Sequence, residues 1–285
     1  FGAVDRWSTP TSRGFEMQVA GAHVFITGGS RGIGAALARE FANAGANVSV
    51  AARSEDTLRR VADEVGGTAF VTDLTDDAQV DGLIARVEAE AGPIDILVNN
   101  AGLETDDQLA AVDVDKIRSV ARVNYEVPVV LTRQVIRGMH ARGGGHLVYL
   151  SSLAGSAGFP SLAVYSGTKS GINNFVAAMR LELSSTEIGT TIVAPGPVDT
   201  AMWDQLEEAS YTDDMLKRLR ALFLIPMISP DRLAKRVVRG VESGRRHVRH
   251  PRRAGATFMF PEVSRRLTEM LMTGVHFPPP PPPES

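Results

Sequence analysis

Short apolar runs alternate along the chain with longer segments in which apolar residues recur every three or four positions. The short runs predict strands and the periodic segments predict helices. The predicted strands are His23–Thr27, Val48–Ala51, Ala69–Val71, Ile94–Val98, His146–Leu150 and Thr190–Val193. The predicted helices run from Ile33 to Gly45 and over Thr57–Val65, Val80–Ala91, Lys116–His140 and Ala163–Leu183. Strands that alternate with helices pair in parallel, because each connecting helix covers a face of the sheet. We therefore predict an α/β fold: a single-domain, Rossmann-like, doubly wound parallel sheet with helices on both faces.

Composition distinguishes both ends of the chain from its centre. Residues 1–17 are rich in Gly, Ser, Thr, Pro and Arg and are predicted to be a flexible leader. Residues 254–285 are predicted to be a C-terminal extension, whose proline run at 278–283 favours polyproline II. Residues 18–253 remain as one predicted domain, a length that suits a single α/β unit.

The overall composition excludes several classes of function. The net charge of −3 gives no general attraction to nucleic acid or to anionic membranes. The absence of cysteine excludes disulfides, thiolate catalysis and cysteine-bound zinc, and it suits a reducing cytoplasm, where we expect the protein to act. No apolar stretch is long enough to span a bilayer. The six histidines lack ligand spacing with carboxylates, so we predict no catalytic metal.

A glycine-rich loop, Thr27–Gly34, leaves the first predicted strand and opens the first predicted helix. Glycine allows a sharp turn and lets a pyrophosphate approach the backbone, while the free N–H groups of the helix start favour an anion. An ordinary glycine-rich turn is the alternative, which the strand before and the helix after make weaker. The predicted cofactor contacts in this loop are Gly28, Ser30, Arg31, Gly32, Ile33 and Gly34.

The end of the second predicted strand bears on the choice of cofactor. An acidic residue there would bind the adenosine ribose hydroxyls, whereas an arginine would pair with a 2′-phosphate. The chain has Arg53 at this point and no carboxylate before it, and Arg31 in the glycine loop can approach the same phosphate. We therefore predict NADP(H) in preference to NAD(H). The alternative is that both arginines are solvated surface cations.

Three further segments follow predicted strands. Asp73 could accept a hydrogen bond from the adenine amino group, or it could cap the helix that begins near Asp76. Asn99–Gly102 has turn chemistry and could be purely structural. Pro195–Thr200 is stiffened by two prolines and could direct its backbone at a carboxamide. The predicted cofactor contacts in these segments are Asp73, Leu74, Asn100, Ala101, Gly102, Pro195, Gly196, Val198 and Thr200.

Tyr165 and Lys169 are four residues apart in a predicted helix and therefore share one face. A nearby ammonium favours the phenolate, so we expect Lys169 to lower the pKa of Tyr165 and to make it a proton donor or acceptor near neutral pH. Ser152 follows a predicted strand, where its hydroxyl can hold a substrate oxygen. Asn124 lies inside a long predicted helix, where asparagine has little intrinsic preference, and a tolerated helix defect is the alternative there.

Taken together, these motifs resemble the short-chain dehydrogenase/reductase superfamily, in its compact single-domain branch, over about residues 22–253. The resemblance implies that Tyr165 donates the proton in reduction and accepts it in oxidation. It implies that Lys169 binds the nicotinamide ribose and tunes Tyr165, and that both residues contact the cofactor. Ser152 would position the carbonyl oxygen, and Asn124 would hold a water that links Lys169 to solvent.

The same resemblance extends to the cofactor and to assembly. Val198 and Thr200 would contact the nicotinamide amide, and the arginines of the glycine loop and of position 53 are similar to those of NADPH-preferring members. A homo-dimer or homo-tetramer is implied, formed through the two long helices around Asn124 and Lys169.

Three segments each allow two interpretations. Residues 201–228 fall where the family places its variable substrate lid, and their apolar residues predict either a pocket for an apolar substrate or simple packing. The basic segment 244–253 could bind an anionic partner or form a solvated basic edge. The apolar residues of 258–277 could pack on a neighbouring subunit or touch a membrane peripherally.

The leading hypothesis is an NADP(H)-dependent oxidoreductase, a carbonyl reductase or alcohol dehydrogenase, that acts on a small molecule through Asn124, Ser152, Tyr165 and Lys169. A sensor or scaffold that binds NADP(H) without turnover is a second hypothesis, although such a protein has no need of the full set. Epimerisation or dehydration on the same fold is a third, and the absence of a substantial substrate domain makes it weaker.

Overall fold

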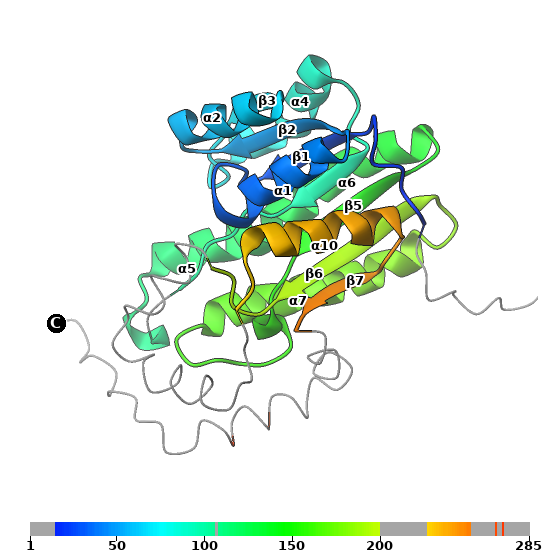
Figure 1. Ribbon diagram of the computed structural model, residues 1–285. Coiled ribbons are helices and arrows are strands. Elements are labelled where there is room, and N and C mark those ends of the chain that lie inside the picture. Colours follow the sequence, from blue (N-terminus) through cyan, green and yellow to red (C-terminus); the bar gives the residue numbers. More distant parts are fainter. Residues whose placement is uncertain (1–14, 106–107, 200–226, 252–265, 267–269, 271–285) are drawn as a thin grey trace, which may run out of the picture.

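The computed structural model describes residues 15–105, 108–199 and 227–251, together with Arg266 and Met270. Its centre is a seven-stranded parallel sheet with the order β3-β2-β1-β4-β5-β6-β7 (Figure 1). The strands are β1 (His23–Thr27), β2 (Asn47–Ala52), β3 (Thr68–Val71), β4 (Ile96–Asn99), β5 (Gly145–Leu150), β6 (Ile188–Pro195) and β7 (His247–His250).

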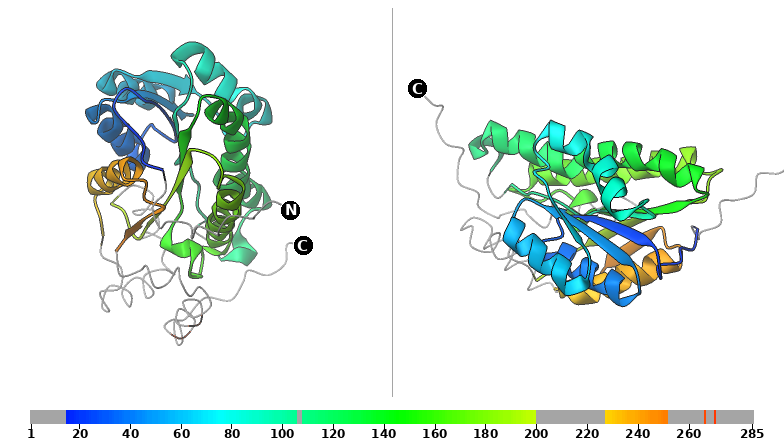
Figure 2. Two further views of the ribbon diagram at one scale, coloured as in Figure 1. Left: turned by 90° about the vertical axis from the view of Figure 1, so that its right-hand side faces the viewer. Right: turned by 90° about the horizontal axis from the view of Figure 1, so that it is seen from above.

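Helices cover both faces of this sheet (Figure 2). The helices are α1 (Gly32–Asn43), α2 (Glu55–Val65), α3 (Asp77–Asp81), α4 (Leu83–Ala91), α5 (Val114–Ala121), α6 (Val127–Ala141), α7 (Ala163–Glu182) and α10 (Pro230–Glu242). Apolar residues of α1, α2 and α10 pack in one core cluster, and those of α3, α4, α6 and α7 pack in the other. The predicted doubly wound α/β fold is confirmed.

The first strand illustrates why these sequences form a central sheet. All five residues of β1 are buried, as expected for a strand whose two faces are both covered. Successive side chains of a strand point to opposite faces, so Val24 and Ile26 join one core cluster while Phe25 joins the other. Because neither face of this strand is exposed to solvent, the strand lies at the centre of the sheet.

The strand order reverses beside β1, and this reversal determines where a ligand can bind. The chain passes from β1 outward to β2 and β3, and then returns to place β4 on the other side of β1. The loops that leave the carboxyl ends of β1 and β4 therefore diverge and open a crevice between them.

The structure differs from the predicted elements in three places. The helix predicted over Val80–Ala91 is two helices, α3 and α4, because Gly82 interrupts it. The long helix predicted over Lys116–His140 is interrupted by a π-helical turn, Arg122–Glu126, that contains Asn124. The helix α10 and the strand β7 were not predicted, and β7 lies within the basic segment 244–253 as an edge strand that pairs with β6.

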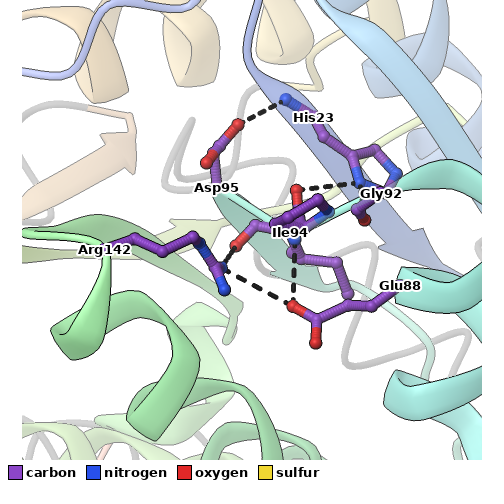
Figure 3. Close-up of polar contacts among 7 residues, drawn as sticks. His23, Glu88, Gly92, Ile94, Asp95 and Arg142 are labelled. Atoms are coloured by element: carbon purple, nitrogen blue, oxygen red, sulfur yellow. Dashed lines mark hydrogen bonds and ion pairs between the residues drawn. The ribbon is translucent and has the colours of Figure 1, made fainter.

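Polar contacts at the opposite, amino-terminal edge of the sheet join β1 to the connection between α4 and β4 (Figure 3). The backbone N–H of His23 donates to Asp95 Oδ2 at 2.8 Å, and the His23 ring lies 2.8 Å from the carbonyl oxygen of Gly92. Arg142, just beyond α6, donates to the carbonyl oxygen of Ile94 at 2.8 Å and forms an ion pair with Glu88 at 3.5 Å. These contacts hold the strand starts in register, away from the crevice.

His146 in β5 is buried and uncharged, and this gives the fold a pH dependence. Its Nε2 lies 2.8 Å from Thr191 Oγ1, and the Thr191 hydroxyl itself donates to the carbonyl oxygen of Arg245 at 2.7 Å. Burial, with a smaller contribution from the nearby Arg180 guanidinium, lowers the pKa of His146 from 6.5 to about 3. The unfolded chain therefore binds a proton at His146 over a pH range in which the folded chain does not.

We expect the free energy of unfolding to decrease as the pH falls from 6.5 towards 3, because protonation favours the unfolded state in that range. The contribution of His146 cannot exceed about 1.4 kcal/mol per pH unit. Denaturant unfolding at several pH values between these limits measures it, with the non-titrating His146→Gln variant for comparison. A variant whose stability depends on pH as steeply as the original would contradict this assignment.

Candidate active site

A cavity of about 470 Å³ lies at the carboxyl ends of the strands, within the usual size of a ligand pocket. Loops that follow β1 to β6 contribute to its wall. Every predicted cofactor contact that the structure describes lines this cavity, as do Ser152, Tyr165 and Lys169. These contacts are Gly28, Ser30, Arg31, Gly32, Ile33, Gly34, Arg53, Asp73, Leu74, Asn100, Ala101, Gly102, Tyr165, Lys169, Pro195, Gly196 and Val198. Thr200 lies outside the described residues.

The glycine loop is folded tightly against the start of α1. Gly28 has φ +69°, a left-handed conformation that favours glycine, and a Cβ on Gly34 would lie 2.1 Å from the carbonyl oxygen of Gly28. No side chain caps the start of α1, and no acidic residue stands in its first turn. The first backbone N–H groups of this helix are therefore not engaged by a capping or acidic side chain of the same turn. This backbone cradle fits a phosphate group.

Residues at the end of β4 hold the loop in place. Asn100 Nδ2 donates to the carbonyl oxygens of Thr27 and Gly28 at 2.8 and 3.2 Å. In return, Thr27 Oγ1 accepts from the backbone N–H groups of Asn100 and Ala101, both at 3.1 Å. The turn at Asn99–Gly102 therefore buttresses the cradle in addition to lining the cavity.

Replacing Gly34 with alanine should weaken the binding of a nicotinamide dinucleotide by about tenfold or more, which corresponds to the loss of about one or two hydrogen bonds. The added methyl would push the loop carbonyl of Gly28 and disturb the cradle. Calorimetric titration with NADP⁺ measures the change. Gly82→Ala is the matched control, since its added Cβ would meet nothing within 4 Å, and equal affinity in the two variants would contradict the cradle.

The end of the cavity near the carboxyl ends of β2 and β3 is positively charged. Arg31 and Arg53 are both exposed and line the wall there. Asp73 Oδ1 accepts from the backbone N–H and the hydroxyl of Thr75 at 2.9 and 2.8 Å. These hydrogen bonds, and the nearby Arg53 guanidinium, lower the pKa of Asp73. Asp76, not Asp73, caps α3, so the capping role considered for Asp73 is wrong.

Ser152, Tyr165 and Lys169 meet at the other end of the cavity. Tyr165 and Lys169 come from α7, and the Lys169 ammonium lies 5.5 Å from the centre of the Tyr165 ring. Lys169 is buried and donates from Nζ to the carbonyl oxygen of Leu150 at 2.8 Å. Ser152 follows β5 and hydrogen-bonds to the Tyr165 phenol. The cavity therefore brings two hydroxyls and one amine together.

The pKa values at this end differ from the sequence expectation. Burial raises the pKa of Tyr165 to about 12, while the hydrogen bond with Ser152 lowers it and the nearby Glu104 carboxylate raises it. Burial lowers the pKa of Lys169 to about 8. The expectation that Lys169 lowers the pKa of Tyr165 is wrong, because the desolvation of the phenol dominates and the ammonium is directed to the carbonyl oxygen of Leu150.

Asn124 does not line the cavity but supports its wall. Its Oδ1 accepts from the backbone N–H of Leu103 at 2.8 Å, and its Nδ2 donates to the carbonyl oxygen of Leu103 at 2.7 Å and to Thr168 Oγ1 at 3.2 Å. A Cβ on Gly102 would lie 3.4 Å from Asn124 Oδ1 and 3.6 Å from Lys169 Nζ, so the two side chains are close. Asn124 is therefore more than a tolerated helix defect. The water that the resemblance assigns to it stays a prediction.

A short turn docks Ser152 against α7, and its contacts were not predicted from the sequence. The 3₁₀ turn Leu153–Gly155 follows Ser152, and the carbonyl oxygen of Gly155 accepts from Ser170 Oγ at 2.8 Å and from Asn173 Nδ2 at 3.3 Å. The signal was available for Asn173, because it lies four residues after Lys169 on the same face of α7. Glu104, which also lines the cavity, carried no motif that could have identified it.

The described part of the chain has neither a membrane-spanning helix nor a metal-binding cluster. No helix there has the length and apolarity needed to cross a membrane. In the same residues, no group of three His, Asp or Glu side chains could hold a metal ion.

Comparisons with known proteins agree on one family. The model of the short chain dehydrogenase family matches residues 22–210. A ketoacyl reductase, HetN, of a Nostoc species is 32% identical over 230 residues, which cover 79% of this chain and 77% of that protein. The 3-oxoacyl-[acyl-carrier-protein] reductase FabG of Escherichia coli is 31% identical over 194 residues, or 67% of this chain and 80% of that protein.

A solved structure is similar as well. A metagenomic short-chain oxidoreductase, crystallised in complex with NADP, is 28% identical, with a TM-score of 0.67, and the match covers 82% of this chain and 98% of that one. With the sheet order, the glycine cradle and the Ser152–Tyr165–Lys169 cluster, these matches lead to one conclusion. The chain belongs to the short-chain dehydrogenase/reductase superfamily and is an NAD(P)-dependent oxidoreductase.

Proposed function

We propose that the protein is an NADP(H)-dependent oxidoreductase that interconverts a carbonyl and a secondary alcohol, with Tyr165 as the general acid and base. The observation that carries this proposal is the meeting of the Ser152 and Tyr165 hydroxyls beside the buried Lys169, in the same cavity as the glycine cradle. A cradle for phosphate and a proton donor at opposite ends of one cavity are what a carbonyl reduction requires.

In the direction of reduction, a nicotinamide dinucleotide held by the glycine loop, Arg31 and Arg53 would supply the hydride that the carbonyl carbon needs. Tyr165 donates its phenolic proton to the carbonyl oxygen, so that one hydride and one proton together convert the carbonyl to an alcohol. Ser152 hydrogen-bonds to the Tyr165 phenol and, in the proposed reaction, donates to the same carbonyl oxygen. Lys169 places a cation near the phenolate that Tyr165 becomes, which stabilises that charge.

The lowered pKa of Lys169 supports a part in proton movement. A pKa of about 8 lets the amine lose and regain a proton near neutral pH, whereas an exposed lysine stays charged. Oxidation of an alcohol requires Tyr165 to act as a base, and therefore to be a phenolate. Its raised pKa means that the phenol on its own does not readily lose its proton to water. With a nicotinamide dinucleotide bound, Lys169 would hold its ribose and support the Tyr165 phenol.

The preference for NADP(H) rests on charge. Arg31 and Arg53 line the cavity where the adenosine ribose of a dinucleotide would lie, and Asp73 is already engaged by Thr75. Two guanidinium groups there favour a 2′-phosphate. The similar metagenomic oxidoreductase, solved with NADP, supports the same choice.

The wall near Tyr165 supports an apolar small-molecule substrate. Leu103, Leu153, Phe159 and Leu162 line it.

We also propose a homo-dimer or homo-tetramer, as the exposed Val114 of α5 and Tyr125 of the π-helical turn present apolar surface for a second copy. Light scattering of the purified protein measures its mass in solution, and a monomer would contradict this part.

A panel of ketones and secondary alcohols, followed by the absorbance of the reduced nicotinamide with NADP(H) and with NAD(H), tests the proposed function. We expect turnover of at least one apolar ketone, faster with NADPH than with NADH. Tight NADP(H) binding with no turnover of any compound would favour the sensor hypothesis. Product formation without a change in the cofactor would favour epimerisation or dehydration.

A further inference from the structure

The Ser152 hydroxyl is held by a backbone group on one side and by the Tyr165 phenol on the other. Its Oγ accepts a hydrogen bond from the backbone N–H of Ala154 at 3.1 Å, at the start of the 3₁₀ turn Leu153–Gly155. A hydroxyl has one proton to donate. Burial raises the pKa of Tyr165, and the hydrogen bond with Ser152 acts against that rise, as donation to the phenolate oxygen does. The turn therefore sets the direction in which Ser152 donates its proton.

Ser152 and Tyr165 belong to different elements, so their distance depends on how this turn packs on α7. Ser152 follows β5, whereas Tyr165 lies near the start of α7. The carbonyl oxygen of Gly155, at the end of the turn, accepts from Ser170 Oγ at 2.8 Å and from Asn173 Nδ2 at 3.3 Å. These two hydrogen bonds, the Gly155 clamp, tie the turn that holds Ser152 to the helix that carries Tyr165.

Gly155 approaches α7 so closely that a side chain would not fit between them. A Cβ at this position would lie 2.7 Å from Asn173 Nδ2 and 3.0 Å from the carbonyl oxygen of Lys169. Just before the turn, Ser151 Oγ donates to the same carbonyl oxygen of Lys169 at 3.4 Å. The turn is thus seated on the stretch of α7 that also carries Lys169, and a shift of the turn along the helix would move Ser152.

The spacing along α7 places the clamp behind the reacting groups. Tyr165, Lys169 and Asn173 follow one another at intervals of four residues and therefore share one face of the helix. A helix rises about 1.5 Å per residue, so Asn173 lies about 12 Å along the axis from Tyr165. Neither Ser170 nor Asn173 belongs to the cavity wall that the described residues form. Both side chains therefore act on the turn and do not touch a substrate.

The Asn173 amide is not well suited to a purely structural role. Its Oδ1 is buried and has no hydrogen-bond partner within the described part of the chain. A buried acceptor without a partner destabilises the folded state. A leucine has nearly the same shape and no polar atom to leave unpaired. Asn173→Leu therefore removes one donor of the clamp without adding a buried polar group, while Ser170 still holds the carbonyl oxygen of Gly155.

We propose that Ser170 and Asn173 are positioning residues, which hold the carbonyl oxygen of Gly155 and thereby keep the Ser152 hydroxyl directed at the Tyr165 phenol. The proposal rests on the proposed function, because it concerns the same acid and base. Its consequence is chemical, since donation from Ser152 favours the phenolate. A loosened clamp weakens that hydrogen bond, so that Tyr165 loses its proton at a higher pH.

The kinetics of alcohol oxidation test this proposal, because Tyr165 must lose its proton before it acts as a base. In Ser170→Ala/Asn173→Leu, which removes both donors, we expect kcat to fall about tenfold, as the loss of one hydrogen bond would give, with KM almost unchanged. The rise of kcat with pH should move to higher pH. Asn173→Leu alone should give a smaller change in the same direction.

The matched control is Asn174→Leu, at the next position of α7, where the side chain is exposed and outside the cavity. This control should keep both the rate and the pH profile of the unaltered protein. Thermal unfolding of each variant shows whether it is folded. A clamp variant that is folded and has an unchanged rate and pH profile would overturn the proposal.

A double-mutant cycle with Ser152→Ala shows whether the clamp acts through Ser152. If it does, the clamp variants have no further effect on kcat once the Ser152 hydroxyl is absent, so the two changes are not additive. A further tenfold loss in the Ser152→Ala background would mean that the clamp acts on the fold or on another group, and it would also overturn the proposal.

Carbon-13 NMR separates this inference from the proposed reaction. Protein labelled at the Cζ of its four tyrosines reports the hydrogen bonding of each phenol, and Tyr165→Phe identifies the Tyr165 signal. We expect the clamp variants to move this signal towards its position in Ser152→Ala. Such a shift supports the positioning even if no alcohol is oxidised, in which case only the proposed function fails. An unmoved signal in variants that still oxidise alcohols sinks the positioning and leaves the proposed function standing.

Discussion

Replacing Tyr165 with phenylalanine should lower kcat for ketone reduction roughly 100- to 10,000-fold, the range that a positioned general acid contributes. The variant loses only the hydroxyl that hydrogen-bonds with Ser152 and faces the cavity. The phenyl ring keeps its packing in α7, so the fold and the cradle for the dinucleotide should persist. Steady-state kinetics and calorimetric titration with NADP⁺ measure the two effects, and the affinity should change by no more than a small factor.

Tyr125→Phe is the matched control for that experiment. Tyr125 is 40% exposed in the π-helical turn and does not line the cavity, so the loss of its hydroxyl should leave turnover unchanged. Equal loss of activity in both variants would point to damaged folding. Full activity in Tyr165→Phe would remove the phenol from the reaction.

Replacing Arg53 with aspartate should lower the ratio of kcat/KM for NADPH over NADH by about 100-fold. The variant removes a charge-assisted contact and places a carboxylate where the 2′-phosphate would lie. The lost attraction and the added repulsion both make the binding free energy of NADPH less favourable, and that free energy determines its affinity. The effect should fall mainly on KM for NADPH, because the phosphate is remote from the reacting carbon. Kinetics with both cofactors at one fixed ketone concentration measure it.

Arg60→Asp reverses the same charge on the exposed surface of α2, outside the cavity, and controls for the general field of the protein. This control should preserve the cofactor ratio. A ratio that does not move in Arg53→Asp would mean that Arg53 is a solvated surface cation and that the preference for NADP(H) has been misassigned.

The sheet was predictable where strands are buried on both faces. The run His23–Thr27 is fully buried in β1, and its composition allows little else than a central strand. The edge strand β7 was missed because Val248 is its one buried residue among basic neighbours, which leaves no alternating pattern to detect. The helix α10 did carry a signal, since Leu233, Val237 and Val241 recur at helical spacing, but it was not used.

The site was predictable to the extent that local chemistry determines it. The glycine loop and the Tyr165–Lys169 pair are short-range patterns, and the structure brings both to one cavity. Long-range contacts were out of reach. The π-helical turn is accompanied by two hydrogen bonds between the Asn124 side chain and the backbone of Leu103, which lies 21 residues earlier. The pKa of Tyr165 was misjudged for the same reason, because its burial and the charge of Glu104 come from the tertiary fold.

Transfer of an isotopic label tests the central claim most directly. The protein is incubated with a ketone that it reduces and with NADPH that carries deuterium at the C4 position of the nicotinamide, first on one face of the ring and then on the other. We expect mass spectrometry to find the label on the carbinol carbon of the alcohol from one face only, and we expect Tyr165→Phe to form this product far more slowly. An alcohol without label from either form of NADPH, or labelled alcohol formed equally fast by Tyr165→Phe, would contradict it.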